Sequence, residues 1–519
     1  MNKVKKWMVV TLALSMTAMA ACSTGNEKNT VEPAASKAPP AEASKDPVKF
    51  TFWTTDGNQA VPGGNLMEDP TIKYLAEKTN TIPEITFLPH GQLDNQKRVK
   101  FASGELPDVS MDFGVNGDLF RNNQLIALDE YIEQYGPNLK KEIPQEAWDA
   151  VKRNGKIYAI PTVQYGNIPV NRIMYVRKDW MNKVGITENP KTSDEFLAML
   201  RAFRDKDPNG NGQKDEIAFS AREQFTWLDN VLGMFGTSVF GGVPVDGQLV
   251  PRNTTQEMKN ALGFVKQLYD EKLLDSEFMT NKRNTWEQKI LSDKVGVWVH
   301  APNLAWDWQD KLNKAYPGKE LEVIAIPTPK APGVTESGFI KTPFNQAFNI
   351  TKNAKDPAAI VKFFDWLVSE EGQEFVSFGI PGVTYTKENG KITYNAQKDA
   401  DDKTDLWRKG TFTILGWNEE LEKVKLGEKA VAKLKEVYAV GNADGMTNYT
   451  LGIPPFKAAQ PEIGEFGTAG TMFVETAGRI VMGDQPLEYF DEYVATWKKQ
   501  GGDDLIKQAT EWYNTNNKK

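Results

Sequence analysis

The sequence predicts an α/β protein of two lobes, each a mainly parallel sheet flanked by helices, with a ligand cleft between the lobes. The chain has 519 residues, and a single hydrophobic core stops growing at about 250–300 residues. Strand patterns and helix patterns alternate along the chain, which is typical of parallel sheets covered by helices. A loop-forming run around Tyr165 separates two strand patterns, and we interpret it as a crossing between the lobes.

Composition narrows the class of protein. Hydrophobic residues make up 40% of the chain and charged residues 25%, as in an ordinary soluble globular protein. The net charge is −7, and no block of the chain is rich in Lys or Arg. Binding to a phosphate backbone requires a basic surface, so the sequence predicts no nucleic-acid partner.

Residues 1–21 have the features of a lipoprotein signal peptide. Three lysines within the first six residues precede an apolar stretch that is too short to span a bilayer. The run Met19-Ala20-Ala21-Cys22 follows and resembles a bacterial lipobox. We predict lipidation of Cys22, which is the only cysteine and therefore leaves no internal disulfide. The alternative is an ordinary signal peptide with a chance cysteine.

Residues 22–47 are predicted to be the lipidated cysteine and a disordered tether. The segment from Ser23 to Pro47 is rich in Ala, Pro, Ser, Lys and Glu and has no aromatic residue. Such a segment cannot bury enough apolar surface to become ordered. Lipid and tether together predict an extracytoplasmic protein anchored to the cell membrane. The low cysteine content and the tethered form are more typical of a Gram-positive cell.

Residues 48–165 are predicted to be the first segment of the first lobe. Strand patterns begin at Val48 and at Ile85, a third strand ends near Asp112, and helix patterns lie between them. In open α/β sheets, ligands bind outside the carboxyl ends of the strands. Three residues at these strand ends are therefore candidate ligand contacts: Trp53, Asp56 and Asp112. Asp112 is equally suited to cap a turn.

The second lobe is predicted to begin with residues 166–338. Strand patterns at Ile157–Ile160 and Ile173–Val176 flank the loop that holds Tyr165, and we count Tyr165 among the candidate ligand contacts. Thr192 and Glu195 have the spacing of a capping box, which predicts that a helix starts there.

Residues 207–216, DPNGNGQKDE, predict a calcium loop. Oxygen-bearing side chains occupy positions one, three, five and nine, glycine occupies position six, and the seventh residue offers its carbonyl, as in an EF-hand. Position twelve is Ala218, so Glu216 at position ten would complete the coordination shell. The predicted ligands of a structural Ca²⁺ are Asp207, Asn209, Asn211, Gln213, Asp215 and Glu216. The alternative is a polar turn without a metal.

Aromatic and polar residues cluster around a predicted strand at Val295–Val299. We predict that five of them contact the ligand: Trp227, Trp298, His300, Asn303 and Trp306. Tryptophan is rarely fully buried, and its face suits a sugar ring. For Trp298, alternation along the strand could instead bury the ring in the core.

The rest of the chain is predicted to return to both lobes. A strand at Asn345–Ile350 and a helix opened by Asp356-Pro357 follow a crossing rich in Pro and Gly. We assign residues 339–400 to the first lobe and residues 401–519 to the second.

The ordered set of motifs resembles the extracellular solute-binding proteins of ABC sugar importers, family 1, and among them the alginate-type oligosaccharide-binding proteins. The motifs are Gly155–Pro161, Lys178-Asp179, Gly185-Ile186, Pro190, Leu106–Val109, Asp356-Pro357 and Ser369–Gly372. The resemblance implies a periplasmic-binding-protein-like fold of type II, whose lobes close around the ligand by a hinge motion. It also implies that Trp298 and Trp417 correspond to sugar-stacking tryptophans and that the 207–216 loop binds calcium.

The function implied by the resemblance is that of a membrane-anchored, monomeric substrate-binding component of an ABC importer. It would capture an oligosaccharide and deliver it to the permease subunits. The 14 Trp and 15 Tyr residues suit sugar surfaces. A peptide or another small solute is the alternative ligand. An acidic sugar would require basic side chains in the cleft, and Arg172 and Arg222 are candidates.

The sequence predicts that the protein is not an enzyme. It has two histidines and no H-E-x-x-H, G-x-S-x-G, Walker or Rossmann motif. A glycosidase needs only two carboxylates, so a lipid-anchored glycoside hydrolase or lyase is the alternative.

Overall fold

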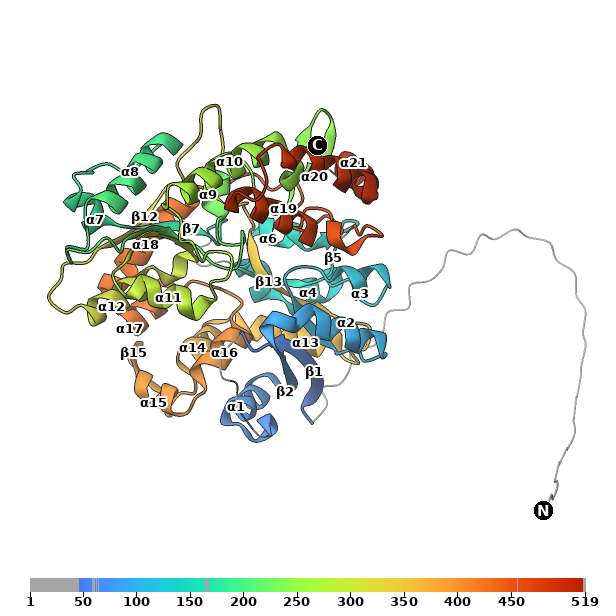
Figure 1. Ribbon diagram of the computed structural model, residues 1–519. Helices are drawn as coiled ribbons and strands as arrows, with labels where there is room; N and C mark the ends of the chain where they lie inside the picture. The colour runs from blue at the N-terminus through green and yellow to red at the C-terminus, as the bar shows by residue number, and fades with distance from the viewer. Residues whose placement is uncertain are drawn as a thin grey trace, which may run out of the picture. The chain divides into compact units, whose positions relative to one another are not determined.

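Two main sheets, each packed on its own hydrophobic core, form the body of the chain in the computed structural model (Figure 1). The structure describes residues 46–57, 61, 63, 65–163, 168–454 and 456–516. The predicted signal peptide, Cys22 and nearly all of the predicted tether lie outside the described residues, and so does Tyr165.

The first sheet has the strand order β2-β1-β3-β13-β6. Its strands are β1 (Val48–Thr55), β2 (Thr81–Leu88), β3 (Val109–Asp112), β6 (Ile160–Val163) and β13 (Phe344–Ile350). Strand β1 pairs in parallel with β2 and β3, whereas β13 is antiparallel to both of its neighbours. The blue β1 and β2 and the yellow β13 in Figure 1 thus join distant parts of the sequence.

The second sheet has the strand order β12-β7-β11-β8. Its strands are β7 (Ile173–Arg177), β8 (Ile217–Ser220), β11 (Val295–His300) and β12 (Val323–Ile326). Strand β11 is parallel to β8, and β7 is antiparallel to both β11 and β12.

Among the described strands of each sheet, one runs against the others: β13 in the first sheet and β7 in the second. Both follow a passage of the chain from the other sheet, β7 after β6 and β13 after β12. A strand that enters from the other lobe begins at the edge where the chain crosses and runs away from it. All the remaining strands therefore end at that edge. The predicted two-lobed fold with mainly parallel sheets is confirmed.

Helices cover the first sheet and supply most of its core. They are α1 (Pro70–Thr79), α2 (Leu93–Ala102), α3 (Gly117–Arg121), α4 (Asp129–Tyr135), α5 (Pro137–Glu142), α6 (Gln145–Ala150), α13 (Pro357–Leu367), α14 (Glu370–Phe378) and α16 (Asp405–Phe412). The predicted Asp356-Pro357 start opens α13, where Asp356 Oδ1 accepts from Ala359 N at 2.9 Å. Asp69 and Pro70 start α1 in the same way, and Asp69 Oδ1 accepts from Thr71 N at 2.8 Å. Ser369 caps α14, which follows directly after α13.

Helices cover both faces of the second sheet. One face packs on α7 (Lys178–Lys183), α8 (Ser193–Asp205), α9 (Asp229–Gly233), α10 (Gln256–Asp270), α19 (Thr471–Met482), α20 (Tyr489–Trp497) and α21 (Asp503–Asn516). The other face packs on α11 (Arg283–Leu291), α12 (Ala305–Ala315) and α18 (Glu428–Ala443). Figure 1 shows the red α19 beside the green α10, which brings the end of the chain into this lobe. The predicted capping box opens α8, with Glu195 N donating to Thr192 Oγ1 at 3.1 Å.

Smaller elements complete the described chain. They are the hairpins β4–β5 (Lys152–Arg153, Lys156–Ile157), β9–β10 (Gly242–Val245, Gln248–Pro251) and β14–β15 (Tyr385–Glu388, Lys391–Tyr394), and the helices α15 (Ala396–Asp401) and α17 (Glu419–Leu426). No helix among the described residues is both long and apolar enough to cross a bilayer.

Two of the expected boundaries differ from the structure. Strand β6 continues through Pro161, which the sheet tolerates because β6 is an edge strand and needs no N–H donor on its outer side. The last crossing comes after Ile414, not at the predicted 400/401 boundary. Trp407 and Phe412 belong to the first-lobe core, because α16 is an amphipathic helix inside an otherwise charged stretch.

Candidate ligand site between the lobes

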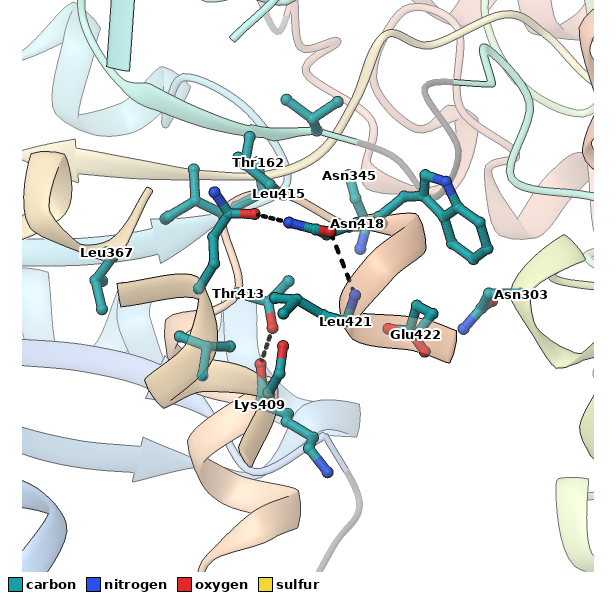
Figure 2. A pocket seen from close by; sticks show the side chains of 18 of the residues that line it. Thr162, Asn303, Asn345, Leu367, Lys409, Thr413, Leu415, Asn418, Leu421 and Glu422 are labelled. Atoms are coloured by element: carbon teal, nitrogen blue, oxygen red, sulfur yellow. Dashed lines mark hydrogen bonds between the residues drawn. The ribbon is translucent and has the colours of Figure 1, made fainter. Parts of the chain in front are cut away.

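A cavity of about 370 Å³ lies where the chain crosses between the lobes (Figure 2). Each crossing contributes to its wall: Thr162-Val163 at the end of β6, Asn345-Gln346 at the start of β13, and the segment 413–418 after α16. Figure 2 shows Asn303, which comes from the second lobe, at the same opening. Any rotation of one lobe against the other therefore changes the shape of this cavity.

The cavity offers one aromatic face and several amide groups. Trp417 is partly exposed, and its ring meets Tyr438 edge-on at 5.0 Å between centroids. Asn418 Nδ2 donates to Gln373 Oε1 at 2.9 Å, which fixes the orientation of this amide. Burial lowers the pKa of Lys409, which also lines the cavity, to about 8. Aromatic faces with amide hydrogen-bonding groups are suited to a polyhydroxylated ligand.

A second cavity, of about 460 Å³, opens at the carboxyl end of β3. Its other wall is part of the 448–466 segment, which precedes α19 of the second lobe. Lys457 Nζ lies 3.4 Å from Asp118 Oδ1 and so joins the two lobes across this opening. Phe113 is 54% exposed and lines the same opening.

Asp112 lies at this second cavity, but its carboxylate is already engaged. Four side chains donate to it: Lys97 at 2.9 Å, Asn116 at 2.9 Å, Ser110 at 2.8 Å and Asn349 at 3.2 Å. Lys97 is only 2% exposed. This network favours the turn-cap interpretation, in which Asp112 orders the end of β3.

The other two first-lobe candidates differ in exposure. Trp53 is buried, with its ring stacked on Phe101 at 5.8 Å, so its predicted contact with a ligand is not supported. The side chain belongs to the core because it points into the layer between β1 and α2. Asp56 is partly exposed, and its Oδ1 accepts from His90 N at 2.9 Å.

Trp227 is the centre of a polar and aromatic cluster in the second lobe. The guanidinium carbons of Arg172 and Arg222 lie 3.8 Å and 4.1 Å from its ring centroid. The Trp227 indole N–H donates to Glu223 Oε2 at 3.1 Å. The His300 ring lies 5.0 Å away between centroids. The predicted residues Trp227 and His300 are thus brought together.

Burial controls the charges in this cluster. Burial raises the pKa of Asp229 to about 7, although Arg172, 3.4 Å away, opposes the shift. Burial lowers the pKa of Arg222 to about 10 against the opposing effect of Glu223. Burial and the nearby Arg222 lower the pKa of His300 well below its usual value, so the imidazole is neutral.

The remaining aromatic candidates separate into core and periphery. Trp298 is fully buried between Tyr175 and Trp308, so the prediction that it contacts ligand is wrong. The physical reason is that helices cover both faces of the second sheet, and alternation places Trp298 under α12. Trp306 is partly exposed and packs against the same core.

The predicted calcium loop forms a tight turn between α8 and β8. Asp207 accepts from the backbone N–H groups of Gly210, Asn211 and Gly212 at 2.9–3.1 Å. Asp215 accepts from Asn211 Nδ2 at 3.0 Å and from Asn209 Nδ2 at 3.2 Å. Gln213 N donates to Asn211 Oδ1 at 2.7 Å. The oxygen-bearing side chains therefore gather on one small loop.

Glu216 is the test of whether this loop fits a cation. Its Oε1 is buried without a hydrogen-bond partner, and burial together with the charges of Asp207 and Asp215 raises its pKa. An oxygen-liganded cation would relieve both effects. In the described part of the chain, no group of three or more His, Cys, Asp or Glu side chains has the geometry of a formed metal site.

Sequence reasoning missed several wall residues of the first cavity. Asn345, Gln346 and Thr162 lie next to crossings, and no motif marks them. The available signal was positional, because a strand that begins after a crossing presents its amino end at the cleft.

Comparison with known proteins identifies the family of this chain. Residues 63–374 match the family described as bacterial extracellular solute-binding protein. The Bacillus subtilis lipoprotein LipO is 24% identical over 539 residues, covering 98% of each chain. The polygalacturonan/rhamnogalacturonan-binding protein YtcQ of the same organism is 24% identical over 528 residues, also covering 98% of each chain.

Solved structures have the same fold. An HMO-binding solute-binding protein from Bifidobacterium longum infantis superposes with a TM-score of 0.66 at 19% identity, covering 92% of this chain and 100% of the other. Alginate-binding protein AlgQ2 gives 0.65 at 21% identity, covering 91% and 99%. The family match spans more than half of the sequence, and the two-lobed fold agrees with it. The chain belongs to the bacterial extracellular solute-binding proteins.

Proposed function

We propose that this chain is the substrate-binding component of an ABC importer, which captures an oligosaccharide between its lobes and delivers it to permease subunits. One observation carries the proposal: the 370 Å³ cavity is lined by residues from all three crossings and from both lobes. Binding there is coupled to the angle between the lobes, as hinge closure around a ligand requires.

The names of related proteins support a carbohydrate as the ligand. YtcQ is named for polygalacturonan and rhamnogalacturonan. The fructooligosaccharide ABC transporter substrate-binding protein FusA of Streptococcus pneumoniae is 30% identical over 251 residues, covering 45% of this chain and 46% of FusA. These names include acidic and neutral sugars, so they leave the charge of the ligand open. We propose that Trp417 and Asn303, which line the 370 Å³ cavity, contact the sugar. Trp227 and His300, whose rings lie 5.0 Å apart in the second lobe, stay predicted contacts.

A non-catalytic role fits the family, whose relatives are named as binding proteins. We propose that the protein returns its sugar unchanged. We also propose a lipid anchor on Cys22, a monomeric state and a Gram-positive cell. An extracytoplasmic location agrees with the family description.

We propose that the 207–216 loop binds a structural Ca²⁺. The six predicted ligands supply only oxygen donors, which is the set that calcium prefers. The unpaired Glu216 Oε1 supports this. Among solved neighbours of the same fold, AlgQ2 is described without calcium ion and FusA as an EF-hand mutant.

The test is a thermal-shift screen of the purified full chain against neutral oligosaccharides, acidic oligosaccharides, peptides and amino acids. Ligand that binds only the folded state raises the unfolding midpoint according to ln(1 + [L]/Kd). We expect a clear shift with an oligosaccharide, and the sugar recovered unchanged. A shift with peptides alone would assign another solute, and a cleaved sugar would assign a hydrolase or lyase.

A further inference from the structure

Buried polar atoms without partners concentrate around Trp227. Arg222 Nε and His300 Nδ1 make no hydrogen bond with any described residue, and Arg172 Nε has only a long ion pair with Asp229 Oδ2, at 3.4 Å. Arg222, Asp229 and His300 are each less than 5% exposed. The large majority of buried side-chain polar atoms in folded proteins have a hydrogen-bond partner. Two unpaired atoms beside one long ion pair indicate a site that a ligand completes.

Glu223 partly occupies this cluster. One of its carboxylate oxygens lies 2.6 Å from Arg222 Nη1, and the other accepts the Trp227 indole N–H at 3.1 Å. The Glu223 side chain is 39% exposed, whereas the Arg222 side chain is 5% exposed. A solvent-facing carboxylate therefore pairs with a buried guanidinium.

The backbone that carries Glu223 is strained. Glu223 has a φ of 54° and Gln224 a φ of 63°, so two consecutive residues with a Cβ adopt the left-handed region. That conformation is uncommon for such residues and persists only where other contacts hold it. Strain of this kind gathers at ligand sites, and a change of backbone conformation here would release it.

We propose that Glu223 stands in for a carboxylate of the ligand, and that an acidic oligosaccharide displaces it from Arg222 and Trp227. This inference rests on the proposed function and narrows its substrate class to sugars with carboxylate groups. Arg222 would then bind the ligand carboxylate in place of Glu223, since a guanidinium binds a carboxylate by two parallel N–H···O bonds.

Packing alone explains part of the cluster but not all of it. Stacking of Arg172 and Arg222 on Trp227 is a common way to hold an indole. It does not account for the unpaired Arg222 Nε, which lies in the guanidinium plane where a carboxylate would bind. A neutral sugar could use these donors too, but it would not compete with Glu223 for the positive charge.

Substitutions of the two members of the Arg222–Glu223 ion pair should change the affinity for ligand in opposite directions. We expect Glu223→Gln to raise affinity for an acidic oligosaccharide about tenfold, because it removes the competing charge. We expect Arg222→Gln to lower that affinity at least tenfold. If Glu223 were a direct ligand contact or a purely structural residue, Glu223→Gln would lower affinity or leave it unchanged.

The experiment is calorimetric titration of the full chain with matched probes. Oligomers of galacturonate, glucuronate and alginate-type uronates are compared with their methyl esters and with neutral fructo-, malto- and xylo-oligosaccharides. The matched control is the Arg201–Glu271 pair, which is bonded at 2.6 Å on the helical surface. Arg201→Gln and Glu271→Gln should leave affinity unchanged.

Each outcome decides between the proposals. Preferred binding of the free uronate, lost on esterification and shifted in opposite directions by the two variants, supports the inference. Preferred binding of a neutral sugar overturns it and leaves the proposed function standing. If peptides bind and no sugar of either charge does, the proposed function itself fails. If Arg222→Gln does not fold, the direction of the Glu223→Gln effect still decides.

Discussion

The two lobes present polar residues at equivalent edges, where strands end at the cleft, and the two edges differ in how fully those residues are paired. At the end of β3, the Asp112 carboxylate accepts from four side chains, one of them a buried lysine. Around Trp227, the buried Arg222 Nε and His300 Nδ1 make no hydrogen bond with the described chain. A position at a strand end therefore does not by itself identify a ligand contact. The unmade hydrogen bonds distinguish a completed structural network from a binding surface.

The largest effect is expected from a substitution that breaks the hydrogen-bond network of Asp112 at the end of β3. Asp112→Ala leaves Lys97, which is 2% exposed, without its carboxylate. Removing one partner of a buried pair costs about 3–5 kcal/mol of unfolding free energy, measurable by urea denaturation. Asp118→Ala, at a partly exposed pair nearby, is the control and should cost less than about 1 kcal/mol. Lost sugar binding with unchanged stability would instead make Asp112 a ligand contact.

Two tryptophans test the same contrast between core and cleft. Trp298→Ala should lower the unfolding free energy by about 3–5 kcal/mol, because the ring is fully buried. Trp417→Ala should leave stability nearly unchanged and weaken sugar binding up to about tenfold, since an aromatic contact contributes roughly 0.5–1.5 kcal/mol. Denaturation and calorimetry measure the two effects. The distinction fails if Trp298→Ala changes affinity without changing stability.

Calcium binding gives a third comparison, because a bound Ca²⁺ would complete the contacts of the oxygen atoms in the 207–216 loop. At a calcium concentration of about one hundred times Kd, binding would add about 2.7 kcal/mol to stability, so a chelator should lower the unfolding midpoint. The effect of Glu216→Gln on stability should have opposite signs with chelator and with calcium. It should stabilise the chelated protein, by removing charge near Asp207 and Asp215, and destabilise the calcium-loaded protein. Identical midpoints with calcium and with chelator would remove the metal from the proposal.

A further expected effect is a pH dependence from Asp229. Burial raises its pKa from 3.8 to about 7, so the folded state holds a proton that the unfolded state releases between these values. The contribution of Asp229 to stability therefore decreases as the pH rises through that window. Compared with Asp229→Asn, the parent protein should lose unfolding free energy between pH 4 and pH 7. Parallel pH profiles for the two proteins would show that Asp229 titrates normally.

Local signals predicted most of the fold. Asp356 with Pro357 and Thr192 with Glu195 start helices where their spacing predicts, because capping depends on a few adjacent residues. Strands β7, β11 and β13 lie within one or two residues of their predicted bounds. The order of strands and helices was enough to predict two mainly parallel sheets.

The site was harder to predict, because it depends on which face of an element meets the cleft. Trp298 was expected at the cleft because tryptophan is rarely fully buried, yet α12 covers that face of its sheet. The Arg222–Glu223 pair could not be recognised either, since it depends on a left-handed turn that no turn residue marks. Trp417 and Asn303 lie at the predicted cleft, but sequence alone could not show that they share one cavity.

The number of passages between the sheets has a consequence for the ends of the chain. The chain starts in the first sheet with β1 and passes to the other lobe after β6, after β12 and after α16. Three is odd, so the two ends of the described chain belong to different lobes, with Asp46 on the first and Asn516 on the second. A membrane attachment ahead of Asp46 would hold one lobe and leave the other free to swing. A pair of reporters at the two ends would then measure closure directly, without altering any residue at the cleft.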